Sequence, residues 1–325
     1  MNAALRLIAT GGALPGRTVT NEDLSRMVDT SDEWITTRTG IRARHWCGEN
    51  ESAATLAIAA AKQALSRSGL APADIGCCIC ATLSAPDATP SVACQIQAAL
   101  SLPENCPALD VNAACSGFLY GTAVARGLLA TMGGRYALVV GCEALSRLID
   151  PTDRSTCVLF GDGAGAVVLE AEENAVYTQA VHSIGSKGEA LTCVSRNQQQ
   201  FIEKDADLSS TYMQMDGKEV FKFAVSKVPE VIMEVLEKAG KTKEEIRFYM
   251  LHQANKRIVA SVSKHMNEPL EKYPMNIENL GNTSSASIPL LLDEWNKKGR
   301  LNSGDWIILS GFGGGLTYGA SLLQW

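Results

Sequence analysis

The sequence predicts a layered α/β fold made of two duplicated halves, and two observations carry this prediction. Apolar runs of strand length alternate with amphipathic stretches of helix length along the 325 residues, and this alternation is typical of sheets covered by helices. In addition, segments of the first half recur in the second. We therefore expect a functional site at the junction of the halves, where strand ends from both meet.

The internal repeat rests on two pairs of segments at nearly one offset. Residues 68–81 and 239–252 share a glycine after a helix, a polar turn, an isoleucine and an apolar strand, with their glycines 171 residues apart. Residues 134–141 and 304–311 are similar at an offset of 170. This period is too long for a solenoid. It indicates two halves, which we place at 1–170 and 171–325.

The elements of the first half follow from local patterns. Apolar residues at helical spacing, such as Leu56, Ala60 and Leu65, predict a helix that ends before a glycine, whereas short continuous apolar runs predict buried strands. In chain order we predict helix 55–68, strand 76–81, helix 93–99, strand 108–111, helix 117–132 and strands 136–140 and 164–169.

The second half repeats this order of elements. The same criteria predict helix 220–239, strand 248–251, helices 256–265 and 287–298, and strands 306–309 and 316–323.

Composition excludes several classes of protein. The net charge of −6 and the pI of about 5.4 argue against a general nucleic-acid binder. No uncharged apolar stretch is long enough to span a membrane, and the first residues lack the apolar core of a signal peptide. We therefore expect a cytoplasmic protein that binds neither nucleic acid nor membrane.

The ten cysteines all lie before residue 194, several of them inside apolar runs. In the cytoplasm such residues are mostly reduced and act as small core hydrophobes. Cys77 and Cys80 form a C-x-x-C pair, which could be redox-active or half of a zinc site, but a second pair is missing and the run is typical of a buried strand. The four histidines are scattered, so we expect no metal.

Cys115 differs from the other cysteines in its position. It follows the predicted strand 108–111 across a turn of small residues and precedes the helix that begins at Gly117. A helix N-terminus presents unpaired N–H groups and the positive end of the helix dipole, so we expect it to lower the pKa of the thiol. Cys115 is a candidate nucleophile, and a buried inert thiol is the alternative.

Two further residues lie in turns of the second half. His252 ends strand 248–251 and is a candidate acid, base or hydrogen-bond donor, unless it is a structural histidine. Asn282 opens helix 287–298 and could cap it or donate to an oxyanion. The glycine run at 311–319 could bring backbone N–H groups close to a reacting carbonyl.

Nucleotide-binding motifs are not supported. Neither glycine-rich segment, 161–165 or 311–319, has the strand–GxGxxG–helix context of a dinucleotide-binding fold. The triplet Gly240–Thr242 suggests a P-loop, but Val235 stands where that motif needs its first glycine.

Five motifs together resemble the β-ketoacyl-acyl-carrier-protein synthase III family, the condensing enzymes that start type II fatty-acid synthesis. The motifs are TSDEWITTRTGI at 30–41, DVNAACSG at 110–117, HQAN at 252–255, GNTSSAS at 281–287 and the glycines 313–315. The resemblance covers essentially the whole chain. It implies the thiolase fold, with five layers (αβαβα) made of two duplicated halves, and a homodimer.

The resemblance also implies a mechanism, with Cys115, His252 and Asn282 as the catalytic triad. Cys115 attacks an acyl-CoA thioester while the N–H groups of Cys115 and Gly314 hold the oxyanion. Malonyl-acyl carrier protein (malonyl-ACP) then enters, and His252 and Asn282 bind its thioester carbonyl as it loses CO₂. The carbanion attacks the acyl-cysteine. A metal or redox cofactor is not needed.

Substrate contacts are implied in the same way. The resemblance assigns coenzyme A contacts to Trp34, Arg38, Arg154, Phe221 and Asn255, and carrier-protein contacts to Lys222, Arg257 and Lys264. Residues 214–264 contain 10 basic and 7 acidic side chains, a local excess of positive charge that would suit an acidic carrier protein.

Three positions depart from the family pattern: Ser116 where many relatives have alanine, Lys218 where many have asparagine, and Thr89 where many have phenylalanine. That phenylalanine ends the primer pocket and reaches across the dimer. We therefore assign Thr89 to the acyl pocket and expect primers longer than acetyl to be accepted.

Other condensing enzymes are weighed against this interpretation. A degradative thiolase uses a second, late cysteine, but none follows Cys193. Elongating synthases use two histidines, whereas this chain has Asn282 at the position of the second histidine. A condensing enzyme or acyltransferase of secondary metabolism stays open. A non-catalytic acyl-carrier-binding subunit is the alternative of a different class, and such a subunit usually lacks the nucleophile.

Overall fold

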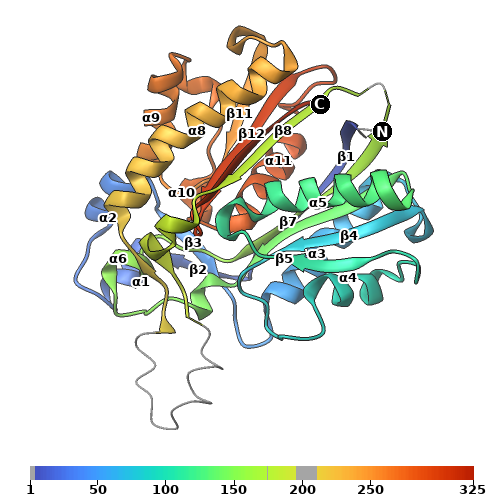
Figure 1. Ribbon diagram of the computed structural model, residues 1–325. Helices are drawn as coiled ribbons and strands as arrows, with labels where there is room; N and C mark the ends of the chain where they lie inside the picture. Colours follow the sequence, from blue (N-terminus) through green and yellow to red (C-terminus); the bar gives the residue numbers. More distant parts are fainter. Residues whose placement is uncertain (1–3, 174, 195–210) are drawn as a thin grey trace.

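The protein is a stack of five layers, in which two sheets alternate with three layers of helices (Figure 1). The structure, a computed structural model, describes residues 4–173, 175–194 and 211–325. Its layered order confirms the α/β prediction.

The first sheet has five strands in the order β1-β7-β6-β4-β5. Strand β4 pairs in parallel with both β5 and β6, whereas β7 pairs antiparallel with β6 and β1. Strands β4 and β6 are almost fully buried, in keeping with a sheet that is covered on both faces. The strand bounds are β1 Ala4–Ala13, β4 Ile75–Ala81, β5 Ala108–Val111, β6 Tyr136–Glu143 and β7 Gly163–Glu172.

The second sheet has four strands in the order β11-β12-β13-β8. Strands β11 and β12 are parallel, and β13 pairs antiparallel with both β12 and β8. The bounds are β8 Tyr177–Ser183, β11 Ile246–Leu251, β12 Trp306–Gly313 and β13 Thr317–Gln324.

Helices fill the layer between the sheets and cover their outer faces. The bounds are α3 Ala53–Ser68 and α4 Val92–Leu100 on the first sheet, α5 Gly117–Met132 and α11 Ser287–Lys297 between the sheets, and α8 Gly217–Ala239 and α9 Lys256–Met266 on the second sheet. Three buried apolar clusters correspond to the interfaces of these layers, and a fourth lies under the N-terminal helices.

The duplication is visible in matching backbone features. Gly69 and Gly240 both end helices in the left-handed conformation. One-turn helices, η2 at Ala114–Ser116 and η8 at Ser284–Ala286, precede α5 and α11 at the predicted offset, and their first residues share positive φ angles of 45° and 49°. These two matching turns lie against each other at the junction of the halves.

The repeated elements match the predicted ones closely, since β5 and α5 have the predicted bounds and the others differ by a few residues at their ends. The N-terminal elements and β8 were not predicted. The N-terminal elements are β1, β2 (Arg17–Thr20), α1 (Asn21–Ser25), α2 (Asp32–Thr39) and β3 (Ala43–Trp46). The remaining α-helices and strands of the described chain are short: α6 (Arg154–Cys157), β9 (Leu191–Thr192), β10 (Gln214–Met215) and α10 (Ile277–Leu280). The chain passes to the second sheet between β7 and β8, and the boundary at 170 stays a prediction.

The C-x-x-C pair lies in β4, where Cys77 and Cys80 are fully buried. Cys80 lies 3.4 Å from Cys142 of β6, sulfur to sulfur. All ten cysteines are present as thiols rather than disulfides. Within the described residues, the structure contains no group of side chains that could hold a metal ion, and no helix long and apolar enough to cross a membrane.

Candidate active site

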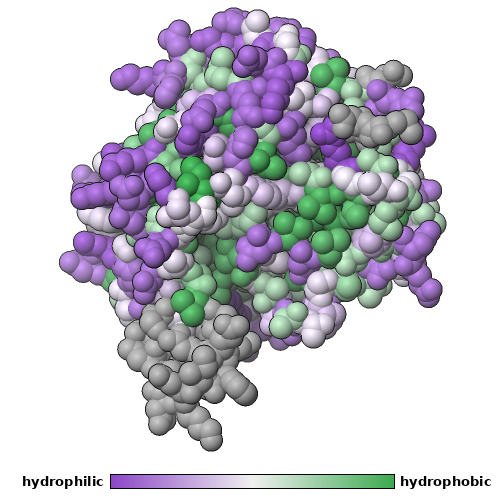
Figure 2. Space-filling model, viewed as in Figure 1, coloured by the Kyte–Doolittle hydropathy of each residue, from purple (hydrophilic) through white to green (hydrophobic). Residues whose placement is uncertain are grey.

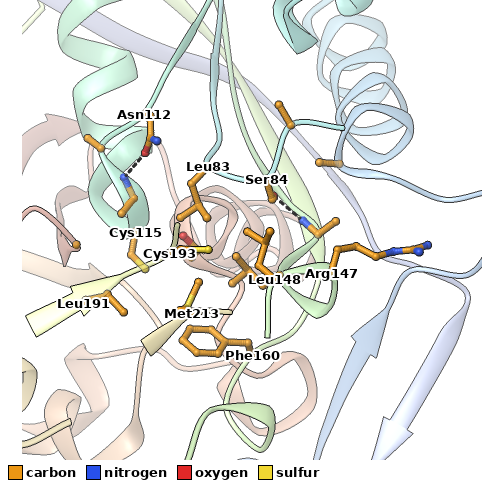
Figure 3. Close-up of a pocket in the computed structure, with 18 of the residues that line it drawn as sticks. Leu83, Ser84, Asn112, Cys115, Arg147, Leu148, Phe160, Leu191, Cys193 and Met213 are labelled. Carbon is orange, nitrogen blue, oxygen red and sulfur yellow. Dashed lines mark hydrogen bonds between the residues drawn. The ribbon is translucent and has the colours of Figure 1, made fainter. Parts of the chain in front are cut away.

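A cavity of about 850 Å³ opens beside Cys115. Figure 3 shows Cys115, Leu83, Leu148, Leu191 and Met213 around one space, while the side chain of Arg147 extends away from it. Gly314 and Ser284 also line the cavity, so residues of both halves form its wall.

Local hydrogen bonds hold Cys115 in its turn. After β5 ends, the Oδ1 atom of Asn112 accepts from the N–H of Ala114 (3.2 Å), and Ala114 takes a positive φ of 45°. The hydroxyl of Ser116 contacts that of Thr317 at 2.7 Å, which ties the turn to β13. Cys115 is therefore held at the contact between the halves, with 7% of its surface exposed.

The environment of Cys115 corrects one sequence-based expectation. The pKa of its thiol is raised to about 12, chiefly by burial and to a smaller extent by the charge of Glu143, while the Ser284 side chain opposes part of the rise. The expected lowering by the helix N-terminus is outweighed, because a buried thiolate loses its hydration. The thiol of Cys115 is therefore protonated at neutral pH in this structure.

His252 follows β11 as predicted and is almost fully buried. Its Nδ1 atom lies 2.6 Å from the hydroxyl oxygen of Ser287, and its ring packs edge-on against Phe312 at 5.4 Å. Burial lowers the pKa of His252 to about 3, so the imidazole is neutral at physiological pH. The Ser287 oxygen also accepts from the N–H of Gln253 (3.4 Å), so this hydroxyl holds both the ring of His252 and the turn that follows it.

Asn282 is held by its backbone and by its side-chain oxygen. Its N–H donates to Leu159 (2.8 Å), its carbonyl accepts from Gly161 (3.0 Å), and its Oδ1 accepts from the N–H of Ser284 (2.9 Å). The side-chain NH₂ makes no hydrogen bond to any residue that the structure describes. Asn282 does not cap the helix that begins at Ser287, as one of its two predicted roles required, because Ala286 is the N-cap there; instead it holds the preceding turn through Ser284 and retains a donor for a ligand.

Strand β12 brings the cysteine and the histidine together. A Cβ atom on Gly311 would lie 3.2 Å from the Cβ of His252, and one on Gly313 would lie 2.5 Å from the backbone nitrogen of Cys115. Residues two apart on a strand face the same side, so His252 and Cys115 approach the same side of β12. Glycine at 313 is required by this close approach.

The residues assigned to coenzyme A form two contact groups. Trp34 lies between two guanidinium groups, with Arg38 at 4.4 Å and Arg154 at 4.8 Å from its ring centre. The amide of Asn255 donates to the carbonyl of Arg38 (3.2 Å). In the second group, Phe221 lies under the guanidinium of Arg257 at 5.9 Å.

The residues assigned to the carrier protein are exposed on neighbouring helices. Lys222 lies on α8 and forms an ion pair with Glu219 (2.7 Å), and Arg257 and Lys264 lie on α9. Helices α8 and α9 pack together, so these cations occupy one region of the surface.

Some features of the site were not predicted. Thr89 is exposed and does not line the cavity within a single chain, so its role in the acyl pocket stays a prediction. The apolar wall comes from segments with no local signature, including Leu148, Phe160 and Met213. The buried Glu143 was also missed, although a lone acidic residue at the end of an apolar strand is an unusual pattern that could have pointed to it.

Comparisons with known proteins identify the class. The solved structure of 3-oxoacyl-[acyl-carrier-protein] synthase III from Aquifex aeolicus superposes with a TM-score of 0.91 at 42% identity and covers 99% of this chain and 100% of that one. The priming β-ketosynthase of the R1128 polyketide pathway superposes with a TM-score of 0.92 at 32% identity, over 99% and 96% of the two chains. The fold is therefore that of the thiolase-type condensing enzymes, as predicted.

Sequence comparisons narrow this class to one family. Two family models, one for 3-oxoacyl-[acyl-carrier-protein] synthase III and one for its C-terminal part, match residues 109–188 and 236–325. The β-ketoacyl-[acyl-carrier-protein] synthase III of Clostridium acetobutylicum is 42% identical over 99% of both chains. The chain belongs to the β-ketoacyl-acyl-carrier-protein synthase III family, which confirms the predicted resemblance.

Proposed function

We propose that this chain condenses an acyl-CoA primer with malonyl-ACP, giving 3-oxoacyl-ACP, CO₂ and CoA, and so initiates type II fatty-acid synthesis. The observation that supports the proposal is a buried thiol in the cavity wall, with a neutral imidazole that approaches the same side of β12 and a side-chain amide that holds Ser284 of the same wall. No cofactor enters this scheme, because the thioester itself activates both substrates.

The first half-reaction transfers the acyl group to Cys115. The thiolate attacks the thioester carbonyl, and the C–S bond to coenzyme A breaks as the new C–S bond forms. The coenzyme A thiolate then takes a proton from solvent. Backbone N–H groups of Cys115 and Gly314 are the donors for the transient oxyanion, in a turn where glycine allows close approach.

The second half-reaction uses the two donors of the C-terminal half. The Nε2–H of His252 and the Nδ2–H of Asn282 hydrogen-bond the thioester carbonyl of malonyl-ACP. As the C–CO₂ bond breaks, its electrons form an enolate that these donors stabilise. The enolate carbon attacks the acyl-cysteine and releases the Cys115 thiolate. A neutral histidine suits this role, because a charged one would protonate the enolate.

The surface groups supply contacts for the two carriers. Trp34 with its two arginines offers a flat, cationic site for the nucleotide part of coenzyme A, and Arg257 and Lys264 offer positive charge to acidic ACP. Acyl-CoA and acyl-ACP thioesters are intracellular metabolites, which supports a cytoplasmic location.

The cavity supports primers longer than acetyl. Its wall is largely apolar, with Leu83, Leu148 and Met213 facing the space beside Cys115 (Figure 3), and it is far larger than a two-carbon group. The similarity to a priming ketosynthase of polyketide synthesis favours, as a second candidate, a primer-loading step in secondary metabolism.

We also propose a homodimer that forms through the first sheet. Strand β5 is an edge strand, and Leu109 on it is 37% exposed. Figure 2 shows apolar surface gathered over α5, where Met132 is 62% exposed. An unpaired edge beside an apolar surface fits a second copy of the same chain.

The direct test is intact-protein mass spectrometry after incubation with acyl-CoAs of increasing chain length. We expect one acyl adduct on the wild type, none on Cys115→Ala, and undiminished adducts on His252→Ala and Asn282→Ala, which should instead fail in condensation. Strict preference for acetyl-CoA would contradict the assignment of long primers. An adduct that persists in Cys115→Ala would exclude Cys115 as the nucleophile.

A further inference from the structure

Arg44 is a buried cation for which the reaction scheme above has no role. It lies on β3 and has no solvent exposure. Its Nη1 atom donates to the carbonyl of Val19 (3.3 Å) and to the Oδ1 atom of Asn21 (2.8 Å), and its Nη2 atom donates to the carbonyl of Val158 (2.7 Å). Among the described residues, no acidic side chain forms an ion pair with Arg44, and its Nε atom has no hydrogen-bond partner.

A guanidinium group buried in this way is costly to the fold. Removing a cation from water is unfavourable unless a counter-charge compensates, and burial lowers the pKa of Arg44 to about 10, which still leaves it charged at neutral pH. Three neutral oxygens compensate for only part of the lost hydration. Such a local cost is expected where a group serves a functional site, and the contacts of Arg44 lead to one.

Arg44 and Trp46 hold one segment of the cavity wall. These side chains are two residues apart on β3 and so face the same side. Arg44 binds the carbonyl of Val158, and the Nε1–H of Trp46 donates to the carbonyl of Phe160 (3.1 Å). Strand β3 therefore fixes residues 158–160, of which Phe160 lines the cavity.

The same segment holds the backbone of Asn282. The N–H of Asn282 donates to Leu159 (2.8 Å), and its carbonyl accepts from Gly161 (3.0 Å). These two bonds flank Phe160 and form a parallel bridge between Phe160 and Asn282. The position of the Asn282 side chain, and of its NH₂ donor, therefore depends on where this segment lies.

The stem of Arg44 packs against both partners of this bridge. A Cβ atom on Gly161 or on Gly281 would lie 3.1 Å from the Cβ of Arg44. Gly281 directly precedes Asn282 and has a φ of 65°, a conformation that favours glycine. The side chain of Arg44 thus lies beside both segments of the bridge, while its guanidinium holds Val158.

We propose that Arg44 is a positioning residue for Asn282 and fixes the backbone from which the Asn282 amide reaches the malonyl thioester. Arg44 is fully buried and is not part of the cavity wall, so it acts through residues 158–161 rather than by contact with a substrate. The inference rests on the proposed function, in which Asn282 donates a hydrogen bond in the second half-reaction.

The proposal assigns Arg44 to one of the two half-reactions. Cys115 is held by a different contact, the hydroxyl pair of Ser116 and Thr317, so acylation should tolerate a change at Arg44. Condensation requires the Asn282 donor at the developing enolate, and a small misplacement of such a group can slow a step by up to about a hundredfold. A purely structural role of Arg44 predicts similar losses in both steps.

The experiment measures the two half-reactions separately in Arg44→Met, which keeps an apolar stem and removes the charge and its donors. Intact-protein mass spectrometry follows the appearance of the acyl adduct with acyl-CoA, and then its loss after malonyl-ACP is added. We expect adduct formation within about threefold of wild type, and adduct loss at saturating malonyl-ACP slower by about tenfold to a hundredfold.

Two further variants separate the contributions of charge and shape. Arg44→Lys keeps the charge but lacks the planar fork that reaches oxygens on two segments, so we expect it to resemble Arg44→Met. Arg26→Met is the control, because Arg26 is an exposed arginine on α1 whose ion pairs are with Glu22 and Asp23 of the same helix. It should leave both half-reactions unchanged.

A double-variant cycle tests whether Arg44 acts through Asn282. In an Asn282→Ala background, Arg44→Met should slow the residual adduct loss little further, because the group that it positions is already absent. Independent action of the two residues would multiply the two losses.

Four outcomes would overturn the inference: equal losses in the two half-reactions, no acyl adduct in either Arg44 variant, an unchanged condensation rate, or multiplied losses in the cycle. Adduct formation itself shows that a variant is folded. A wild type that forms no adduct, or whose adduct persists with malonyl-ACP, would instead refute the proposed function.

Discussion

At the scale of single residues, burial rather than motif sets the chemistry of the site. Cys115, Glu143 and His252 are all buried, and in each case desolvation is the largest cause of the altered pKa, which favours the neutral form. Burial thus keeps the Cys115 thiol and the His252 imidazole uncharged at neutral pH, whereas Glu143, with a pKa of about 7, is partly ionised there. Serine hydroxyls hydrogen-bond Glu143 and the ring of His252, and they compensate for part of the lost hydration of these two groups.

The raised pKa of Glu143 predicts a pH-dependent stability. Between its ordinary value of 4.5 and about 7, the folded state binds more protons at this site than the unfolded state. The free energy of unfolding must therefore fall as pH rises through this window, by at most about 1.4 kcal/mol for each pH unit that it spans. We expect the Tm advantage of the wild type over Glu143→Gln to be larger at pH 5 than at pH 8.

Thermal unfolding of both proteins in one buffer series checks this prediction. His252 and the other titrating groups are common to both, so their contributions largely cancel in the difference. Parallel curves of Tm against pH would show that Glu143 does not titrate in this range.

At the scale of elements, glycines allow the backbones of the two halves to meet. Strand β6 lies against turn η8 at Gly141, where a Cβ atom would stand 2.3 Å from the carbonyl oxygen of Ser285. Strand β12 meets η2 at Gly313 in the equivalent way. Both turns carry groups of the site, so the packing of strand on turn and the positions of Cys115 and Ser284 depend on each other.

Gly141→Ala should therefore impair both stability and chemistry. The added methyl group meets backbone rather than a flexible side chain, so η8 must shift, and we expect a loss of about 1–3 kcal/mol, typical of overpacking. Denaturant unfolding and acyl-adduct formation measure the two effects. Gly185→Ala is the control, because its Cβ atom has open space; equal behaviour of the two variants would refute the prediction.

Helix α9 should act in the second half-reaction alone. Reversing the charge of the exposed Arg257 removes attraction for an acidic carrier protein but leaves the thiol untouched. We expect Arg257→Glu to raise the KM for malonyl-ACP severalfold at low salt, less at high salt, and to leave acylation by acyl-CoA within about twofold of wild type. Arg247→Glu, on β11, is the control. A slower acylation step would instead place Arg257 in coenzyme A binding.

At the scale of the whole molecule, the duplication explains the position of the site. The equivalent turns η2 and η8 meet between the sheets. Turn η2 contributes the Cys115 thiol, whereas η8 contributes the residues that follow Asn282. The two halves supply different groups to one cavity (Figure 3). Separate halves would therefore leave the site incomplete.

The proposed dimer gives a prediction at this scale. Leu109→Lys places a charge on the edge of β5, where a second copy of the chain would pair. Sedimentation velocity should find a dimer for the wild type and a larger monomer fraction for the variant. Met233→Lys, an exposed methionine on α8, should leave the dimer intact. A monomeric wild type would refute the interface.

Much of the repeated framework could be predicted because its signals are local. Helix periodicity, apolar strands and terminal glycines lie within a few residues of one another, so the bounds of β5 and α5 were predicted as found. The N-terminal strands lack such signals. Strand β1 is specified by antiparallel pairing with β7, which lies in the distant segment Gly163–Glu172, and its own segment alternates only imperfectly.

The candidate site likewise has one part that local sequence signals predict and one part that they do not. Cys115, His252 and Asn282 could be predicted as candidate site residues, together with their turns, because each motif is a short, continuous segment. The acidity of those groups, the apolar segments that line the cavity and the contact between Glu143 and Ser284 all arise from the folded structure. Desolvation and contact depend on packing between distant segments, and no local pattern encodes that packing.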